Sequence, residues 1–177
     1  ELSSGESAFS LDPALLMILA QIGGVLIPAL LFLAWTRQPM TTTLKLRAPD
    51  IRTALACLLI GLLCWPLVIE QSNVSALITA LSGPQVGGAS DIVTQGGSPW
   101  ISLLGIVLVA PLFEELLFRG VFLDAYETAT GGHAIWLVAV LFAVYHFSPE
   151  NFLLPLVIGL LAGWLAYRTR SIWAGVL

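Results

Sequence analysis

The chain has 177 residues, of which 58% are hydrophobic and only 10% are charged, and its mean hydropathy is +0.93. Soluble globular domains carry about 25% charged residues, so this composition excludes an ordinary soluble fold and indicates an integral membrane protein. The formal net charge is −4, and the sequence has no basic patch that would suggest a nucleic-acid partner. The lipid bilayer is therefore the first partner that we expect.

Five apolar stretches predict the fold class, an all-α polytopic transmembrane bundle of about five spans plus the start of a sixth. A helix needs about 20 residues to cross about 30 Å of hydrocarbon. The fourth and fifth stretches are shorter, so we expect them to be tilted or covered by neighbouring helices. In chain order the stretches are residues 14–35, 52–70, 100–123, 134–147 and 152–167, and the apolar segment that follows Arg170 begins the sixth.

The stretches and the loops between them divide the chain into three parts. Residues 1–13 are predicted to be an extracytoplasmic N-terminal segment. Residues 14–99 are predicted to hold two transmembrane helices and a glycine-rich outer loop, with a short interfacial helix at 73–81. Residues 100–177 are predicted to form the functional core, incomplete at its C-terminal end.

Basic residues predict the orientation, because cytoplasmic loops collect Lys and Arg. Alternating the five spans puts all seven basic residues on or toward one side, which leaves residues 1–13 and the 71–99 loop on the other side. We therefore expect a bacterial plasma-membrane protein with its N-terminus outside. The seven are Arg37, Lys45, Arg47, Arg52, Arg119, Arg168 and Arg170.

Two pairs of small residues inside the spans are interpreted as structural. Gly159 and Gly163 have the spacing that lets membrane helices approach closely. Cys57 and Cys64 share one helical face without the spacing of a metal site, so we interpret them as buried thiols.

Glu114, Glu115 and Arg119 interrupt the third apolar stretch. A charged side chain at the centre of a membrane helix costs roughly 2.5–3.5 kcal/mol on insertion scales, so such residues are functional candidates. On a helix Glu115 and Arg119 are four residues apart and can pair, whereas Glu114 points about 100° away. We expect one glutamate to be held by the arginine and the other to be available for chemistry.

His146 is the second ionisable residue inside an apolar stretch. Counting residues from the cytoplasmic turn between the third and fourth helices puts Glu114 and His146 at a similar depth on antiparallel helices. A glutamate and a histidine within the membrane can activate water for peptide hydrolysis, either by general-base catalysis or by holding a metal ion. Two alternatives stay open: a non-catalytic membrane partner in which Glu115 and Arg119 form a structural ion pair, and a transporter fragment that relays protons or cations.

Three motifs resemble the CPBP intramembrane metalloprotease family, which includes the type II CAAX prenyl endopeptidases. They are Glu114-Glu115-xxx-Arg119-Gly120, Phe142-xxx-His146 and the segment from Gly159 to Ala174. The resemblance covers residues 100–177 and implies a membrane-embedded endopeptidase.

The resemblance also implies roles for single residues. Glu114 is the expected water activator, supported by the pair of Glu115 and Arg119. His146 is expected to assist or to stabilise the oxyanion, with Phe142 as its structural companion. The family name implies a divalent metal such as zinc, held here by Glu114 and His146, although similar proteins are argued to use glutamate and water alone.

Substrates and partners follow from the same resemblance. The implied substrate is a peptide or a lipidated protein, and bacterial relatives are linked to peptide maturation, bacteriocin immunity or an attached ABC-type permease. The non-catalytic alternative is therefore an immunity protein or a membrane partner that is associated with an ABC-type permease. The family pattern continues to a second histidine followed four residues later by asparagine, beyond the last residue of this sequence, so we expect a longer protein.

Overall fold

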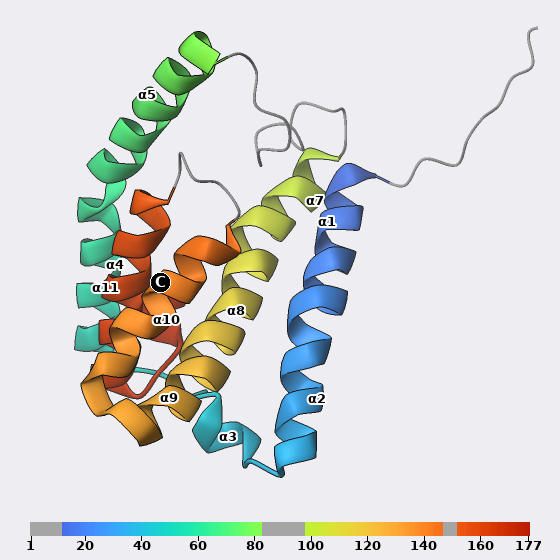
Figure 1. Ribbon diagram of the computed structural model, residues 1–177, viewed down its shortest axis with the longest axis vertical. Coiled ribbons are helices and arrows are strands. Elements are labelled where there is room, and N and C mark those ends of the chain that lie inside the picture. Colours follow the sequence, from blue (N-terminus) through green and yellow to red (C-terminus); the bar gives the residue numbers. More distant parts are fainter. Residues whose placement is uncertain (1–11, 83–97, 147–151) are drawn as a thin grey trace, which may run out of the picture.

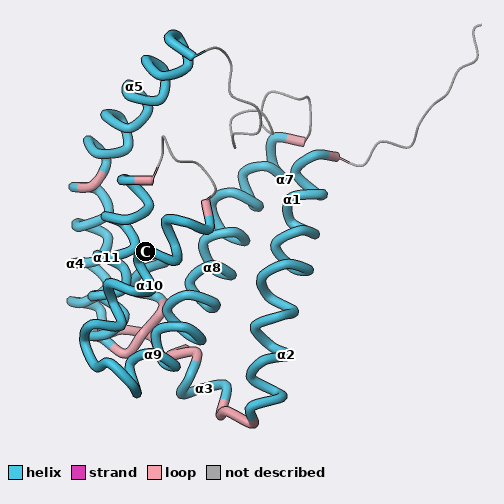
Figure 2. Tube along the Cα trace, viewed as in Figure 1, coloured by secondary structure: helices cyan, strands magenta, loops and turns pink. Residues whose placement is uncertain are grey.

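The computed structural model of the protein describes residues 12–82, 98–146 and 152–177. All regular structure in these ranges is helical (Figures 1 and 2). Three stretches of helix are long and apolar enough to cross a membrane: Pro13–Thr36, Ile51–Glu70 and Pro99–Tyr145. A shorter apolar helix, Leu153–Thr169, accompanies them. The predicted all-α membrane bundle is confirmed.

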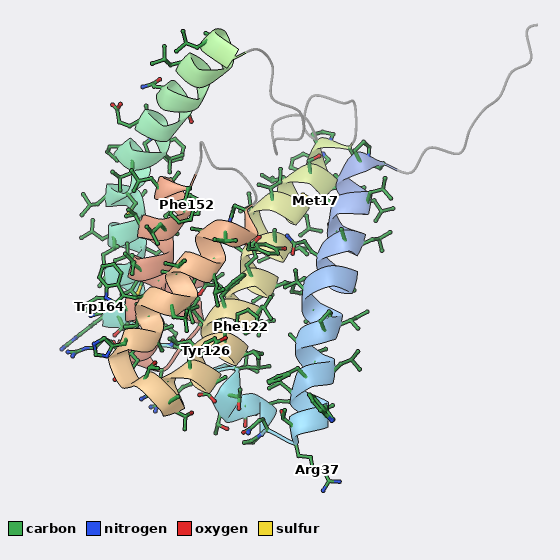
Figure 3. The ribbon with its side chains drawn as sticks, in the orientation of Figure 1. Met17, Arg37, Phe122, Tyr126, Phe152 and Trp164 are labelled. Atoms are coloured by element: carbon green, nitrogen blue, oxygen red, sulfur yellow. The ribbon has the colours of Figure 1, made fainter. Side chains whose placement is uncertain are left out.

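The N-terminal helix is continuous over the first candidate span. Asp12 caps it as the Asp-Pro sequence suggests, because its Oδ1 accepts a hydrogen bond from the Ala14 N–H at 2.8 Å and Pro13 occupies the first turn. Arg37 ends the helix in the left-handed conformation, and Figure 3 labels it at the lower end of the bundle. The segments are α1 (Pro13–Gln21), the π-helical η1 (Ile22–Leu26) and α2 (Ile27–Thr36), followed by the short α3 (Met40–Thr43).

The second membrane helix differs from its prediction at its C-terminal end. Helix α4 (Ile51–Leu63) breaks at Cys64, just before Pro66, and α5 (Trp65–Ser82) follows it. The predicted apolar stretch 52–70 is confirmed as the candidate span Ile51–Glu70. Residues 73–81 are helical as predicted, but they continue α5 and do not form a separate interfacial helix. Polar residues after Glu70 reduce hydropathy, but without Gly or Pro they do not end a helix. The glycine-rich loop lies outside the described residues.

The third and fourth predicted stretches are separate helices that run in opposite directions (Figure 1). The chain reverses at Gly131, where φ is 58°, a conformation that glycine adopts without a steric penalty. The third helix continues to Thr130, beyond the predicted end at residue 123. Its segments are α7 (Pro99–Leu104), η2 (Gly105–Val109), α8 (Ala110–Glu115), η3 (Leu116–Phe122) and α9 (Leu123–Thr130), and the turn η4 (Gly131–His133) leads to α10 (Ala134–Tyr145).

The last helices pack closely on the fourth. Helix α11 (Leu153–Thr169) lies against α10, and α12 (Trp173–Val176) ends the chain. A Cβ atom at Gly159 would lie only 3.1 Å from the Cα of Ala139, so the absence of a side chain permits this approach. The predicted packing role of Gly159 is confirmed.

Lys45 forms ion pairs with acidic side chains of α9 at the lower end of the bundle. Its Nζ lies 3.3 Å from Asp124 Oδ1 and 3.9 Å from Glu127 Oε2, and its side chain is only 2% exposed. Glu127 in turn pairs with Arg170 at 2.6 Å. Basic loops that are far apart in the sequence therefore share one end of the molecule, as the orientation argument requires.

Candidate active site

The carboxylates lie on a short α-helical segment between two π-helical ones. Glu114 and Glu115 end α8, η2 precedes that segment, and η3, which carries Arg119, follows it. Single π-helical turns inside α-helices occur frequently at functional sites. Segment α8 contacts α1 and η1, and it also contacts α12. The site therefore lies between the first helix and the last segment of the chain.

Glu115 and Arg119 form the predicted ion pair. Arg119 Nη1 lies 2.8 Å from Glu115 Oε1, and the two residues are 0% and 6% exposed respectively. The N–H direction is poorly aligned, so the contact is a charge pair more than a hydrogen bond. Arg119 also stacks on the Phe142 ring, with Cζ 4.3 Å from its centroid, and Nη2 approaches the Gly159 carbonyl oxygen at 3.5 Å. The guanidinium thus connects α10 and α11 to the helix that carries the carboxylates.

Gly175 of α12 lies directly against the Glu115 carboxyl group. A Cβ atom added at Gly175 would lie 2.7 Å from Glu115 Cδ and closer still to Oε2. Among the described residues no donor reaches that buried Oε2 atom. The sequence offers no signal for this contact beyond a glycine in the last segment.

Glu114 points away from this pair, toward α1 and the C-terminal end of α10. Its Oε1 accepts a hydrogen bond from Gln21 Nε2 at 3.3 Å. Its carboxylate also interacts electrostatically with His146 and with Arg119. The structure therefore places Glu114 within electrostatic range of His146, as their matched depth predicts, whereas Glu115 makes the direct contact with Arg119.

His146 caps the C-terminus of α10 and is exposed. Its Nδ1 lies 2.8 Å from the Phe142 carbonyl oxygen. Because a carbonyl oxygen only accepts hydrogen bonds, this contact assigns the proton to Nδ1 and leaves Nε2 for other partners. The Phe142 ring packs on the His146 ring at 4.7 Å and also beneath Arg119. Phe142 thus contacts His146, as the resemblance implies, and Arg119 as well.

The described residues do not fit a firmly held metal ion. In the ranges that the structure covers, no group of three or more His, Cys, Asp or Glu side chains is placed to bind one. A catalytic zinc site commonly uses three protein ligands, whereas Glu114 and His146 supply two donors.

The two cysteines lie apart from these residues. Cys57 is buried and Cys64 half-buried, and both are free thiols. They line a cavity of about 250 Å³ between α4, α5, α11 and α12. Gly175 also lines this cavity, so it touches both the cavity and the Glu115 carboxyl group.

Gln21 was not a predicted site residue. Its contact with Glu114 joins residues that are 93 positions apart, and sequence alone does not show which helices become neighbours. One signal was present, because Gln21 is the only amide, hydroxyl or charged side chain between Pro13 and Trp35. An isolated polar residue in a membrane span is costly and marks a functional candidate.

Comparison with known proteins places the carboxylates and the histidine within one family. Residues 96–177 match the family model described as type II CAAX prenyl endopeptidase Rce1-like. No curated protein and no solved structure matches the chain. The matched segment contains Glu114, Glu115, Arg119 and His146, and the structure groups these residues between α8, η3 and α10. Residues 96–177, somewhat less than half of the chain, are therefore similar to the type II CAAX prenyl endopeptidase Rce1-like family, a family of proteases.

Proposed function

We propose that this protein is an intramembrane endopeptidase in which Glu114 activates a water molecule for attack on a peptide bond. The observation that carries the proposal is the separation of roles between neighbouring carboxylates. Glu115 neutralises Arg119 at 2.8 Å, whereas Glu114 contacts a neutral amide and lies within electrostatic range of His146. Glu114 is thus the carboxylate available as a general base.

In the proposed reaction the oxygen of the water attacks the carbonyl carbon of the substrate while Glu114 takes one proton. The π electrons of the carbonyl group move to its oxygen and form a tetrahedral oxyanion. When the oxyanion collapses, the C–N bond breaks and the leaving nitrogen takes the proton from Glu114. The products are a carboxylic acid and an amine, and the carboxylate is regenerated.

His146 is suited to act beside Glu114. With Nδ1 donating to the Phe142 carbonyl oxygen, Nε2 is the nitrogen that can face the reacting groups. In the imidazolium form Nε2–H donates to the oxyanion, and fixed donors of this kind stabilise developing negative charge. The edge-to-face contact with the Phe142 ring restricts the orientation of the imidazole ring.

The proposed substrate is a membrane-associated peptide or a lipidated protein. The family description refers to CAAX prenyl endopeptidases, whose substrates carry a lipid on cysteine. The cavity of about 250 Å³ is lined mainly by apolar side chains and shares Gly175 with the site. This position supports an apolar group bound beside Glu115, the neighbour of the reacting Glu114.

The test compares protein N-termini in membranes that contain either the wild-type protein or the Glu114→Gln variant. We expect cleavage products only with the wild type, because the amide cannot accept the proton of the water. Glu70→Gln is the matched control, since Glu70 is exposed on α5 and outside the site, and it should give the wild-type products. Identical N-termini from wild type and Glu114→Gln at equal expression would overturn the proposal in favour of a non-catalytic membrane partner.

A further inference from the structure

Gln21 is fixed beside Glu114 by the close packing of α1 on η2. A Cβ atom at Gly105 would lie 2.6 Å from Met17 Cε and 3.2 Å from Ile18 Cγ1, and Figure 3 labels Met17 between these helices. Gln21 follows Met17 by one helical turn and therefore lies on the same face of α1. A hydrogen bond also connects the start of α1 with the start of α7, because Asp12 Oδ2 accepts from the Ser98 N–H at 2.6 Å.

The nitrogen and the oxygen of the Gln21 amide have different hydrogen-bond surroundings. Its Nε2 donates to Glu114 Oε1 at 3.3 Å. Its Oε1 is buried, and within the described residues no donor reaches it. Buried polar atoms are almost always hydrogen-bonded in native proteins, so an acceptor without a partner calls for a specific explanation. An ionised Glu114 only accepts hydrogen bonds, so it cannot supply the missing proton.

We propose that Gln21 is a further catalytic residue and that its Oε1 accepts a hydrogen bond from the attacking water. This inference rests on the proposed function. One O–H of the water points to Glu114, which removes that proton, and the other O–H points to Gln21 Oε1 and stays on the oxygen. With both hydrogens directed at acceptors, a lone pair of the water is left to face the carbonyl carbon of the substrate.

The same amide also orients the base. Because Nε2 is bonded to Glu114 Oε1, the carboxylate and the Gln21 oxygen are held as neighbouring acceptors. Oriented reactants lower the barrier without a change in substrate affinity. The N-terminal helix therefore completes a site whose other members lie within residues 96–177.

The experiment measures kcat and KM of the purified protein on a quenched fluorescent peptide. The peptide spans a cleavage site found in the comparison of N-termini described above. Gln21→Met removes the amide but nearly preserves the volume of the side chain. We expect kcat to fall by about tenfold or more, the loss of roughly one hydrogen bond in the transition state, while KM stays within about twofold. Gln38→Met, the same substitution at an exposed position after α2, should keep the wild-type kcat.

Melting temperature in detergent separates this role from a structural one. Gln21→Met removes the unpartnered Oε1, which favours folding, and also the Nε2 donor to Glu114, which opposes it, so we expect the melting temperature to change little. A fall in both kcat and melting temperature would overturn the inference in favour of a packing role. If Gln21→Met does not fold, Gln21→Asn keeps an amide but withdraws the oxygen by one methylene, and a wild-type kcat in that variant would likewise overturn it.

Including Glu114→Gln in the series separates this inference from the proposed function. If Glu114→Gln is inactive and Gln21→Met retains the wild-type kcat, the protease stands and the role of Gln21 is wrong. If no cleavage depends on Glu114, the proposed function is wrong and the role of Gln21 falls with it. Loss of kcat in both variants, with KM and melting temperature maintained in Gln21→Met, supports the inference.

Discussion

Two adjacent glutamates have different surroundings because each lies on a different side of one helix. Glu115 lies inward, where Arg119 is completely buried and Phe142 covers the guanidinium. Removing one partner of a buried ion pair typically costs about 3–5 kcal/mol, since it leaves the other charge uncompensated. Glu115 is therefore tied to folding, while Glu114, half-buried and bonded to Gln21, is the carboxylate to which we assign the proposed proton transfer.

Gly175→Ala should disturb this arrangement with a single methyl group. The added Cβ would lie 2.7 Å from Glu115 Cδ, so the carboxyl group has to move away from its contact with Arg119. We expect at least about a tenfold loss of proteolytic rate, equivalent to about 1.4 kcal/mol, measured on the same fluorescent peptide. Gly24→Ala is the control, because nothing lies within 4 Å of a Cβ at that position. A wild-type rate for Gly175→Ala would show that α12 yields and does not position Glu115.

The residues of the site differ in how far sequence could predict them. Helical spacing alone pairs Glu115 with Arg119, since residues four apart share a face. Counting residues on either side of the chain reversal at Gly131 predicts that Glu114 and His146 lie at a similar depth. The contacts of Gln21 and Gly175 with the carboxylates depend on which distant helices become neighbours, and no local pattern encodes that.

At the scale of elements, caps were predictable and helix ends were less so. Asp12 begins a helix as the Asp-Pro sequence suggests, and its side chain accepts a backbone N–H bond. Helix α5 continues past residue 70, because a fall in hydropathy marks where a segment leaves an apolar environment and not where its hydrogen bonding stops. Gly131, in contrast, ends α9 through its backbone conformation.

Asp12 connects two elements and gives their junction a pH dependence. The hydrogen bond from the Ser98 N–H holds the pKa of the Asp12 carboxyl group below its ordinary value, and the bonds from the start of α1 act in the same direction. A lowered folded-state pKa means that the stabilisation is present above the unfolded value, about pH 4, and is lost as pH falls through the folded value. The junction of α1 with α7 should therefore loosen in acid.

Asp12→Asn tests this dependence. We expect its melting temperature in detergent to lie below that of the wild type at about pH 6, and the difference to shrink toward about pH 3 as the wild-type carboxylate is protonated. Subtracting the two curves removes the contribution of other titrating groups. A melting-temperature difference for Asp12→Asn that is constant with pH would contradict the prediction.

At the scale of the whole molecule, the basic residues define one end. Lys45 and Arg170 meet the acidic residues of α9 there, and Arg37 ends α2 at the same end. Because cytoplasmic loops collect Lys and Arg, we expect this end to face the cytoplasm and the start of α7 to face outward.

Cysteine labelling in intact bacterial cells measures that orientation. In a Cys57→Ala/Cys64→Ala background, a membrane-impermeant maleimide should label Trp100→Cys, at the start of α7, and should not label Gln38→Cys. Both starting side chains are exposed, so lysed cells should show labelling of both variants. Labelling of Gln38→Cys alone in intact cells would mean that the protein is inserted the other way round.

The buried position of Lys45 has a consequence for biosynthesis. Its Nζ pairs with Asp124 and Glu127, and its carbonyl oxygen accepts a hydrogen bond from the Ile172 N–H at 3.1 Å. Synthesis runs from the N-terminus, so Lys45 leaves the ribosome before every one of these partners. The ammonium group of Lys45 therefore lacks its carboxylate partners until residues 124–127 have been made, and its carbonyl oxygen lacks the Ile172 N–H until nearly all of the described chain has been made. A translocon or chaperone that shields the early intermediate would act during this interval.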